Sequence, residues 1–148
     1  MHSWKPSIDV PLRMLVLVVL GLMAPSTQAI SPDAITGVWL TQKEDGYIEI
    51  NKIGARYQGK IIGSPSGDTS RVDINNPQPQ LRSRPLLGVV IIDDMMFAED
   101  EWRNGTIYDP DNGKTYRCRL SIADGELIVR GYIGNPLFGR TQRWTRHQ

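Results

Sequence analysis

Two carboxylates, an amide and a glycine stand together in the segment DPDNG, residues 109–113. Such a set could hold calcium, which takes its ligands from carboxylate and amide oxygens. A calcium-binding EF-hand loop that begins at Asp109 would need glycine at its sixth position and glutamate at its twelfth. The sequence has Lys114 and Leu120 there. We therefore interpret the segment as a structural turn in which Gly113 takes a positive φ, and we predict no metal site.

Residues for nucleophilic catalysis are scarce. The histidines, His2 and His147, lie near the two ends of the sequence, which argues against a catalytic triad or a histidine metal site. Cys118 alternates with apolar neighbours and is predicted to be a buried, unreactive thiol. The acidic run 93–101 is interpreted as a solvated loop, with a site for a cation or a basic partner as the alternative. The sequence thus predicts no catalytic residue and no cofactor, and a protein that is not an enzyme.

The strongest candidates for ligand binding lie in a long connection, Ser64–Pro85, and in one later strand. Arginine is suited to bidentate recognition of carboxylate or phosphate, and the connection holds two arginines in a patterned segment. The later strand, 129–134, alternates polar and apolar side chains. The alternative for the connection is that its aspartate and arginines only tie it to the rest of the domain. The candidate ligand-binding residues are Arg82, Arg84, Asp73, Asn76, Arg130 and Tyr132.

Short runs rich in β-branched and aromatic residues, separated by turn residues, predict an all-β domain. Thr115–Ile122 alternates in polarity, so one face of that strand is buried and the other is wet. Antiparallel strands of this kind avoid exposed edges by closing into an up-and-down barrel. The eight predicted strands are Gly37–Thr41, Tyr47–Ile53, Arg56–Gly63, Leu86–Ile92, Trp102–Tyr108, Lys114–Ile122, Glu126–Ile133 and Arg140–His147.

The N-terminal region has the order of a secretory signal peptide. Lys5 and Arg13 precede the apolar run Met14–Met23, and small residues lead to Ala29. The run is too short to span a bilayer, which needs about 20 residues. We expect cleavage after Ala29 and a periplasmic or secreted protein with no transmembrane segment in the mature chain. The predicted organisation is a signal peptide (1–29), a short arm (30–34) and one barrel domain (35–146).

The charge of the mature chain argues against two classes of partner. After removal of residues 1–29 it would hold 15 basic and 15 acidic residues. A general nucleic-acid binder needs excess positive charge, and so does a polybasic membrane-surface protein. Cys118 is the single cysteine, so no internal disulfide forms and burial must hold the fold together.

Several short motifs, taken in order, resemble the bacterial domain of unknown function numbered 2147. The resemblance covers roughly Ile35–Arg146 and implies a small exported protein with a lipocalin-like (calycin-type) antiparallel barrel of roughly eight strands. It implies no catalytic residues. By similarity to the barrel-closing corner of lipocalins, Trp39 is expected to pack against Arg143 or Arg146, through a cation–π contact worth about 0.5–2 kcal/mol. The motifs are Gly37-Val38-Trp39, Asn76-Pro77, Leu81–Gly88, Ile107–Pro110, Gly113–Tyr116, Val129–Tyr132 and Thr141…Trp144.

Two functions fit a barrel of this size, whose interior is filled by side chains or holds one small ligand. The first is binding of a small hydrophobic or amphipathic molecule in the barrel or at its mouth. The alternative is a filled barrel that acts as an envelope interaction or stress-accessory protein. An open cavity with arginine or tyrosine at its mouth favours the first function, and a filled apolar interior favours the second.

Overall fold

The computed structural model describes residue 2 and residues 25–148. The apolar run of the predicted signal peptide, Met14–Met23, lies outside the described residues. Across the part of the chain that is described, no helix has the length and apolarity needed to cross a membrane.

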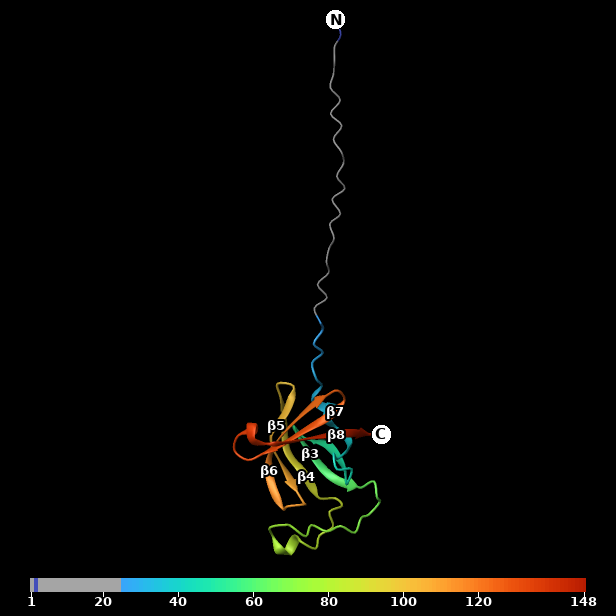
Figure 1. Cartoon of the computed structure of the whole chain (residues 1–148), viewed down its shortest axis with the longest axis vertical. Helices are drawn as coiled ribbons and strands as arrows, with labels where there is room; N and C mark the ends of the chain where they lie inside the picture. Colours follow the sequence, from blue (N-terminus) through green and yellow to red (C-terminus); the bar gives the residue numbers. More distant parts are fainter. Residues whose placement is uncertain (1, 3–24) are drawn as a thin grey trace.

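Eight antiparallel strands form a closed barrel, which confirms the predicted fold class (Figure 1). Each strand pairs with the next along the chain, and β1 pairs with β8 through Trp39 opposite Arg146. Closure leaves no strand of the barrel with an unpaired edge. The strands are β1 Gly37–Leu40, β2 Tyr47–Ile53, β3 Arg56–Gly63, β4 Val90–Ala98, β5 Glu101–Asp109, β6 Lys114–Ala123, β7 Glu126–Tyr132 and β8 Arg140–His147. Three short 3₁₀ helices accompany them: η1 Pro32–Ile35, η2 Pro79–Leu81 and η3 Pro136–Phe138.

The fourth strand is the element that the sequence placed wrongly. It runs from Val90 to Ala98, and not from Leu86 to Ile92, so it takes in Asp93 and Asp94 of the acidic run that we expected to be a loop. Glu99 and Asp100 of the same run do form the turn to β5. Two features allow Asp93 and Asp94 to lie within the strand. Asp94 has φ +58°, in a region where the pairing of β3 with β4 shifts register, and a bulge of this kind breaks simple alternation. The carboxylates also have partners on β3: Asp94 lies 3.4 Å from Arg56, and Asp93 accepts a hydrogen bond of 3.0 Å from Gln58.

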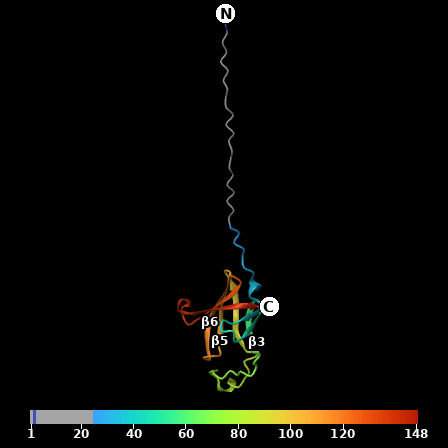
Figure 2. The ribbon, with the colours of Figure 1, turned by 45° about the vertical axis from the view of Figure 1, so that its right-hand side comes forward.

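The helix η1 plugs one end of the barrel. Trp39 donates its indole N–H to the carbonyl of Ile35 at 2.9 Å, and Trp102 donates to the carbonyl of Pro32 at 3.0 Å. The hydroxyl of Tyr57 donates to Asp33 at 2.6 Å. Ile35 itself is fully buried. The N-terminal segment reaches the barrel at this end, as Figures 1 and 2 both show.

The opposite end carries the long connection between β3 and β4, residues 64–89, which is green to yellow in Figure 2. This loop folds back on itself: Val72 pairs with Pro85 in an isolated bridge, and Leu86 donates its backbone N–H to the carbonyl of Arg71 at 2.9 Å. Asn75, near its tip, donates to two carbonyls of the β5–β6 turn, each at 3.0 Å. The loop is therefore bonded to the barrel at its tip as well as at its ends.

Candidate ligand-binding cavity

A cavity of about 540 Å³ opens at the end of the barrel that carries the long loop. Its inner walls are apolar and come from alternate residues of neighbouring strands, whose side chains point to the same face of the sheet. Isoleucines 48, 61 and 107 lie on β2, β3 and β5, and Val129 lies on β7. Near the plugged end the interior is instead filled, for example at Gly59, where an added Cβ would meet Ile48, Ile92 and Ile50 at 3.2–3.3 Å. The barrel is thus packed at one end and hollow at the other.

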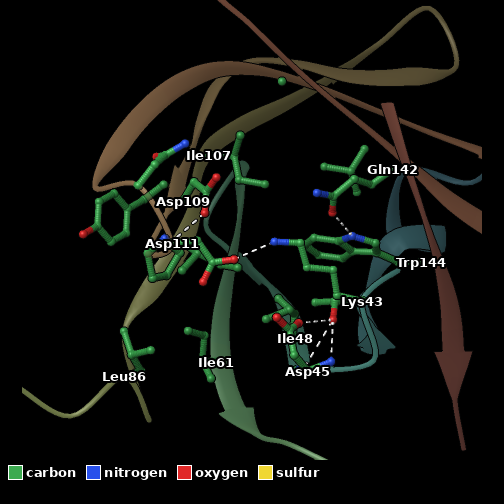
Figure 3. Close-up of a pocket in the computed structure, with 18 of the residues that line it drawn as sticks. Lys43, Asp45, Ile48, Ile61, Leu86, Ile107, Asp109, Asp111, Gln142 and Trp144 are labelled. Atoms are coloured by element: carbon green, nitrogen blue, oxygen red, sulfur yellow. Dashed lines mark hydrogen bonds and ion pairs between the residues drawn. The ribbon is translucent and has the colours of Figure 1, made fainter. Parts of the chain in front are cut away.

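Trp144 and Gln142 supply an aromatic surface and a polar group inside the cavity. Trp144 is only 2% exposed, and its indole N–H donates to the amide oxygen of Gln142 at 2.8 Å (Figure 3). Both residues line the cavity. Because the amide oxygen accepts from the indole, the amide nitrogen of Gln142 is the group that can donate to a molecule in the cavity.

Charged residues bridge the mouth of the cavity. Lys43, in the β1–β2 turn, donates to Asp111, in the β5–β6 turn, at 2.6 Å (Figure 3). Arg71, from the long loop, lies 3.4 Å from the same carboxylate. The hydrogen bond from Lys43 lowers the pKa of Asp111, and the same bond raises the pKa of Lys43. Three connections that are distant in the sequence are therefore joined by ion pairs at the mouth.

Asp73 lies at the centre of a buried network in the long loop. Its side chain is fully buried and accepts hydrogen bonds from Tyr108 at 2.6 Å, Asn76 at 2.8 Å and Arg84 at 2.9 Å. Burial alone would raise the pKa of Asp73, but these hydrogen bonds and the charge of Arg84 lower it overall. Burial and the hydrogen bond to Asp73 raise the pKa of Tyr108 to about 12. The network ties the loop to β5, which is the arrangement expected from the tether alternative.

The six predicted ligand-binding residues do not form one site. Arg82 donates to the carbonyl of Asn76 at 2.8 Å, within the loop. Arg130 donates to the carbonyl of Pro136 at 2.7 Å and to the hydroxyl of Thr141 at 2.6 Å. Tyr132 is the member of the six that lines the cavity. No ligand is present to test the assignment, so it stays a prediction.

The residues predicted to be structural are Trp39, Arg143 and Gly113. The guanidinium of Arg146 lies over the ring of Trp39, with its Cζ 4.2 Å from the centroid, whereas Arg143 pairs with Glu126 at 2.8 Å. Of the two arginines considered for the barrel corner, it is therefore Arg146 that covers the tryptophan. Gly113 has φ +70° and donates its N–H to the carbonyl of Asp109 at 2.8 Å.

Cys118 and the DPDNG segment were the two other sites considered from the sequence. Cys118 is fully buried, and burial raises the pKa of its thiol to about 12, so the reactive thiolate is scarce at neutral pH. In residue 2 and residues 25–148, no group of three or more His, Cys, Asp or Glu side chains could hold a metal ion. The acidic groups at the DPDNG segment are instead engaged with backbone N–H groups and cations, such as the N–H of Asp111, which donates to Asp109 at 3.0 Å.

Sequence reasoning did not name four polar residues that line the cavity as ligand-binding candidates: Lys43, Arg71, Asp111 and Gln142. Gln142 could have been predicted from the sequence. Residues two apart in a strand face the same side, so a buried Trp144 indicates that the side chain of Gln142 also faces the lumen. The charged residues lie in turns and in the long loop, where no periodicity indicates which way a side chain points.

The profile of the family "Uncharacterized protein conserved in bacteria (DUF2147)" matches residues 37–146. The chain belongs to this family. A solved structure, of protein HP1028 from the human pathogen Helicobacter pylori, described as belonging to the lipocalin family, is similar with a TM-score of 0.70 and 25% sequence identity. The similarity covers 76% of this chain and 82% of that one. A search of curated proteins finds no significant match. The comparisons confirm the resemblance inferred from the motifs of this DUF2147 protein.

Proposed function

We propose that the protein binds a small, partly apolar molecule in the hollow end of the barrel. The observation that carries this proposal is the cavity of about 540 Å³ with isoleucine, valine and tryptophan on its inner walls. Small-molecule sites typically measure roughly 300–1,000 Å³ and combine apolar walls with a few polar groups. Here Gln142 is a polar group inside, and Lys43, Arg71 and Asp111 are charged groups at the mouth.

The hollow end favours binding over the alternative of a filled barrel. A filled barrel would use its interior for packing alone, as this chain does near η1. Fold similarity by itself does not license a function, so the proposal rests on the cavity and not on the lipocalin likeness.

Binding is tested by placing a bulky side chain inside the cavity. Ile61 lines the cavity, whereas its neighbour Ile62 is 38% exposed and does not line it. Native mass spectrometry of the protein from its own host would report a co-purifying small molecule, and titration with a fluorescent amphipathic probe would report its affinity. We expect Ile61→Trp to weaken probe binding by about tenfold or more, since the ring would occupy the ligand's volume. Ile62→Trp is the matched control and should bind as the wild type does.

Equal probe binding by wild type, Ile61→Trp and Ile62→Trp would contradict the proposal. Melting temperatures of all three proteins would establish that each is folded. If the wild type binds no probe and carries no co-purified molecule, the filled-barrel alternative becomes the better account.

We further propose that the protein works in the periplasm or is secreted. The supporting features are the charged and apolar segments before Ala29 and the small residues that lead to it. Intact-mass measurement on the protein exported by its host should give an N-terminus at Ile30. A full-length species retained in the membrane would contradict this.

A further inference from the structure

The connection between β7 and β8 displays large apolar side chains to solvent. Ile133, Leu137 and Phe138 are 70%, 80% and 84% exposed, and we call these three residues the apolar tip. The connection projects away from the barrel as the orange-red loop that joins β7 to β8 in Figure 1. Single exposed apolar residues are ordinary, but three grouped on one loop commonly mark an interaction surface.

Hydrogen bonds hold the loop in this conformation. The side chain of Asn135 accepts the backbone N–H of Leu137 at 2.9 Å, which caps η3. Arg130 reaches the loop from β7 and donates to the carbonyls of Pro136 at 2.7 Å and Leu137 at 3.2 Å. Gly139 lies so close to the carbonyl of Gly131 that an added Cβ could not be accommodated. The backbone is thus fixed while its largest side chains point outward, so their exposure does not come from a loose loop.

In the described part of the chain, three arginines without a carboxylate partner lie on the strands next to the apolar tip. Arg140 follows the loop directly and pairs with Gly131 across the sheet, and Arg117 pairs with Tyr132, the residue before Ile133. Within residue 2 and residues 25–148, neither arginine forms an ion pair with a carboxylate. Arg130 bonds only to carbonyl and hydroxyl oxygens, so its charge is also not neutralised locally. The apolar tip and these three arginines, Arg117, Arg130 and Arg140, together form a patch of net positive charge, although the predicted mature chain as a whole is neutral.

We propose that the apolar tip and its three arginines dock the barrel on an anionic lipid bilayer. Leu137 and Phe138 would enter the boundary between headgroups and acyl chains, while Arg117, Arg130 and Arg140 would lie at the level of the lipid phosphates. Exposed apolar side chains flanked by basic residues bind such interfaces through apolar burial and attraction to anionic lipids together. Arginine also matches the geometry of phosphate. The charge of the patch is what selects a lipid surface over an uncharged apolar partner.

The docking geometry has a consequence for the cavity. Ile133, Phe138 and Arg140 belong to the rim of the cavity as well as to the patch. A docked barrel would therefore hold its mouth beside the bilayer, where an amphipathic molecule could pass between them. This consequence rests on the proposed ligand binding, whereas docking itself does not.

Docking is tested by vesicle flotation of the protein as its host exports it. The vesicles contain either phosphatidylcholine alone or phosphatidylcholine with phosphatidylglycerol. We expect the wild type to float with the anionic vesicles, to bind them less at high salt, and to leave the neutral vesicles largely unbound. The double variant Leu137→Ser/Phe138→Ser should bind anionic vesicles about tenfold less or weaker still, because it loses the inserted apolar surface. Ile53→Ser is the matched control: Ile53 is 58% exposed but lies at the β2–β3 turn, away from the mouth, so binding should not change.

A second variant reports insertion directly. Phe138→Trp places an indole on the apolar tip, whereas Trp39, Trp102 and Trp144 are buried. Anionic vesicles should shift its emission to shorter wavelength, and brominated lipids should quench it. The proposal is overturned if the wild type binds neither vesicle type, if it binds both equally, or if the serine double variant binds as the wild type does. It is also overturned if the double variant alters only release of a bound probe, because the tip would then be a lid on the cavity.

Discussion

Gly113 joins two parts of the mouth. It ends the β5–β6 turn with φ +70°, and its Cα faces the backbone of Asn75 in the long loop so closely that an added Cβ would overlap the Asn75 carbonyl. Asn75 in turn donates to the carbonyls of Pro110 and Asp111. The glycine is therefore required for its φ and for the close approach of the loop.

The two requirements can be separated with a matched glycine. Gly54 has φ +62°, but nothing lies within 4 Å of the position its Cβ would take. We expect Gly54→Ala to lower the free energy of unfolding by about 1 kcal/mol, which is the backbone strain alone. Gly113→Ala should cost about 2–4 kcal/mol, because the strain is joined by displacement of the loop. Urea unfolding measures both, and equal losses would contradict the close approach. Calcium should leave the melting temperature of the wild type unchanged.

Arg84 and Arg82 lie two residues apart in the long loop and have different hydrogen-bond partners, so the stability losses of their alanine variants can be compared. Arg84 bonds to the buried carboxylate of Asp73, while Arg82 bonds to a backbone carbonyl. The Arg84 side chain is 37% exposed, so solvent screens part of its interaction. We expect Arg84→Ala to cost about 1–3 kcal/mol by leaving Asp73 short of a partner, and Arg82→Ala about 0.5–1.5 kcal/mol. Thermal and urea unfolding would give the order, and a larger loss for Arg82→Ala would contradict the tether.

At the scale of elements, the plug η1 shows how one short helix can close a barrel. Its carbonyls accept hydrogen bonds from two buried indoles, and Arg146 adds bonds to the carbonyls of Thr36 at 3.0 Å and Ala34 at 2.7 Å. The same guanidinium lies over Trp39. The buried carbonyl of Ile35 is thereby given a partner at the closed end, and Arg146 fastens the exposed side of the plug to β8.

Arg146 and Arg143 both lie on β8, and replacing each with alanine tests whether Arg146 holds the plug η1 in place. We expect Arg146→Ala to lower the free energy of unfolding by about 1–3 kcal/mol, since it removes a cation–π contact and two hydrogen bonds. Arg143 pairs with Glu126 on the surface, and a surface ion pair contributes only about 0–1 kcal/mol. Arg143→Ala is thus the control, measured by urea unfolding. Similar losses for the two variants would mean that the plug does not depend on Arg146.

Most of the strands could be predicted from the sequence, but β4 and the cavity could not. Regular alternation, as at Tyr116, Cys118 and Leu120, predicted the strands and hence the barrel. A period of two indicates a strand that has one buried face and one exposed face. Alternation failed at β4, where the register against β3 shifts between Gly59 and Lys60, so that two adjacent residues, Ile91 and Ile92, are both buried. The cavity depended on contacts between turns far apart in the chain, such as Lys43 with Asp111, and local patterns carry no information about these.

At the scale of the whole molecule, the packed interior and the proposed binding cavity lie at opposite ends of one barrel. The plugged end holds Trp39 and Trp102, both fully buried, with η1 packed against them. The hollow end holds the cavity, the long loop and the apolar tip. Because apolar packing is concentrated at one end, the mouth can carry charged contacts that open without unfolding the barrel.

The bridge between Lys43 and Asp111 is the contact we expect to open when a ligand enters or leaves. Both side chains are substantially exposed, so the pair is screened by salt and contributes little to stability. We expect Lys43→Ala to speed the release of a bound probe by about two- to tenfold, in line with an exposed ion pair worth about 1 kcal/mol, and to leave the melting temperature nearly unchanged. Lys60→Ala is a control, because Lys60 pairs with Glu49 on the barrel wall.

The pH dependence of release follows from the two pKa shifts. The pKa of Asp111 is lowered in the closed mouth, so the bridge is intact above the ordinary carboxyl range and is lost as pH falls through that lowered pKa. The pKa of Lys43 is raised, so at high pH the bridge is lost only as pH rises through that raised value. Release measured by stopped-flow fluorescence should therefore be constant between about pH 5 and pH 9, faster in strong acid, and faster at high salt. For Lys43→Ala, release should accelerate less with salt than for the wild type, because only the longer pair of Arg71 with Asp111 is left to screen. A wild-type rate that ignores salt, or a variant that responds to it as the wild type does, would mean that the bridge does not control the mouth.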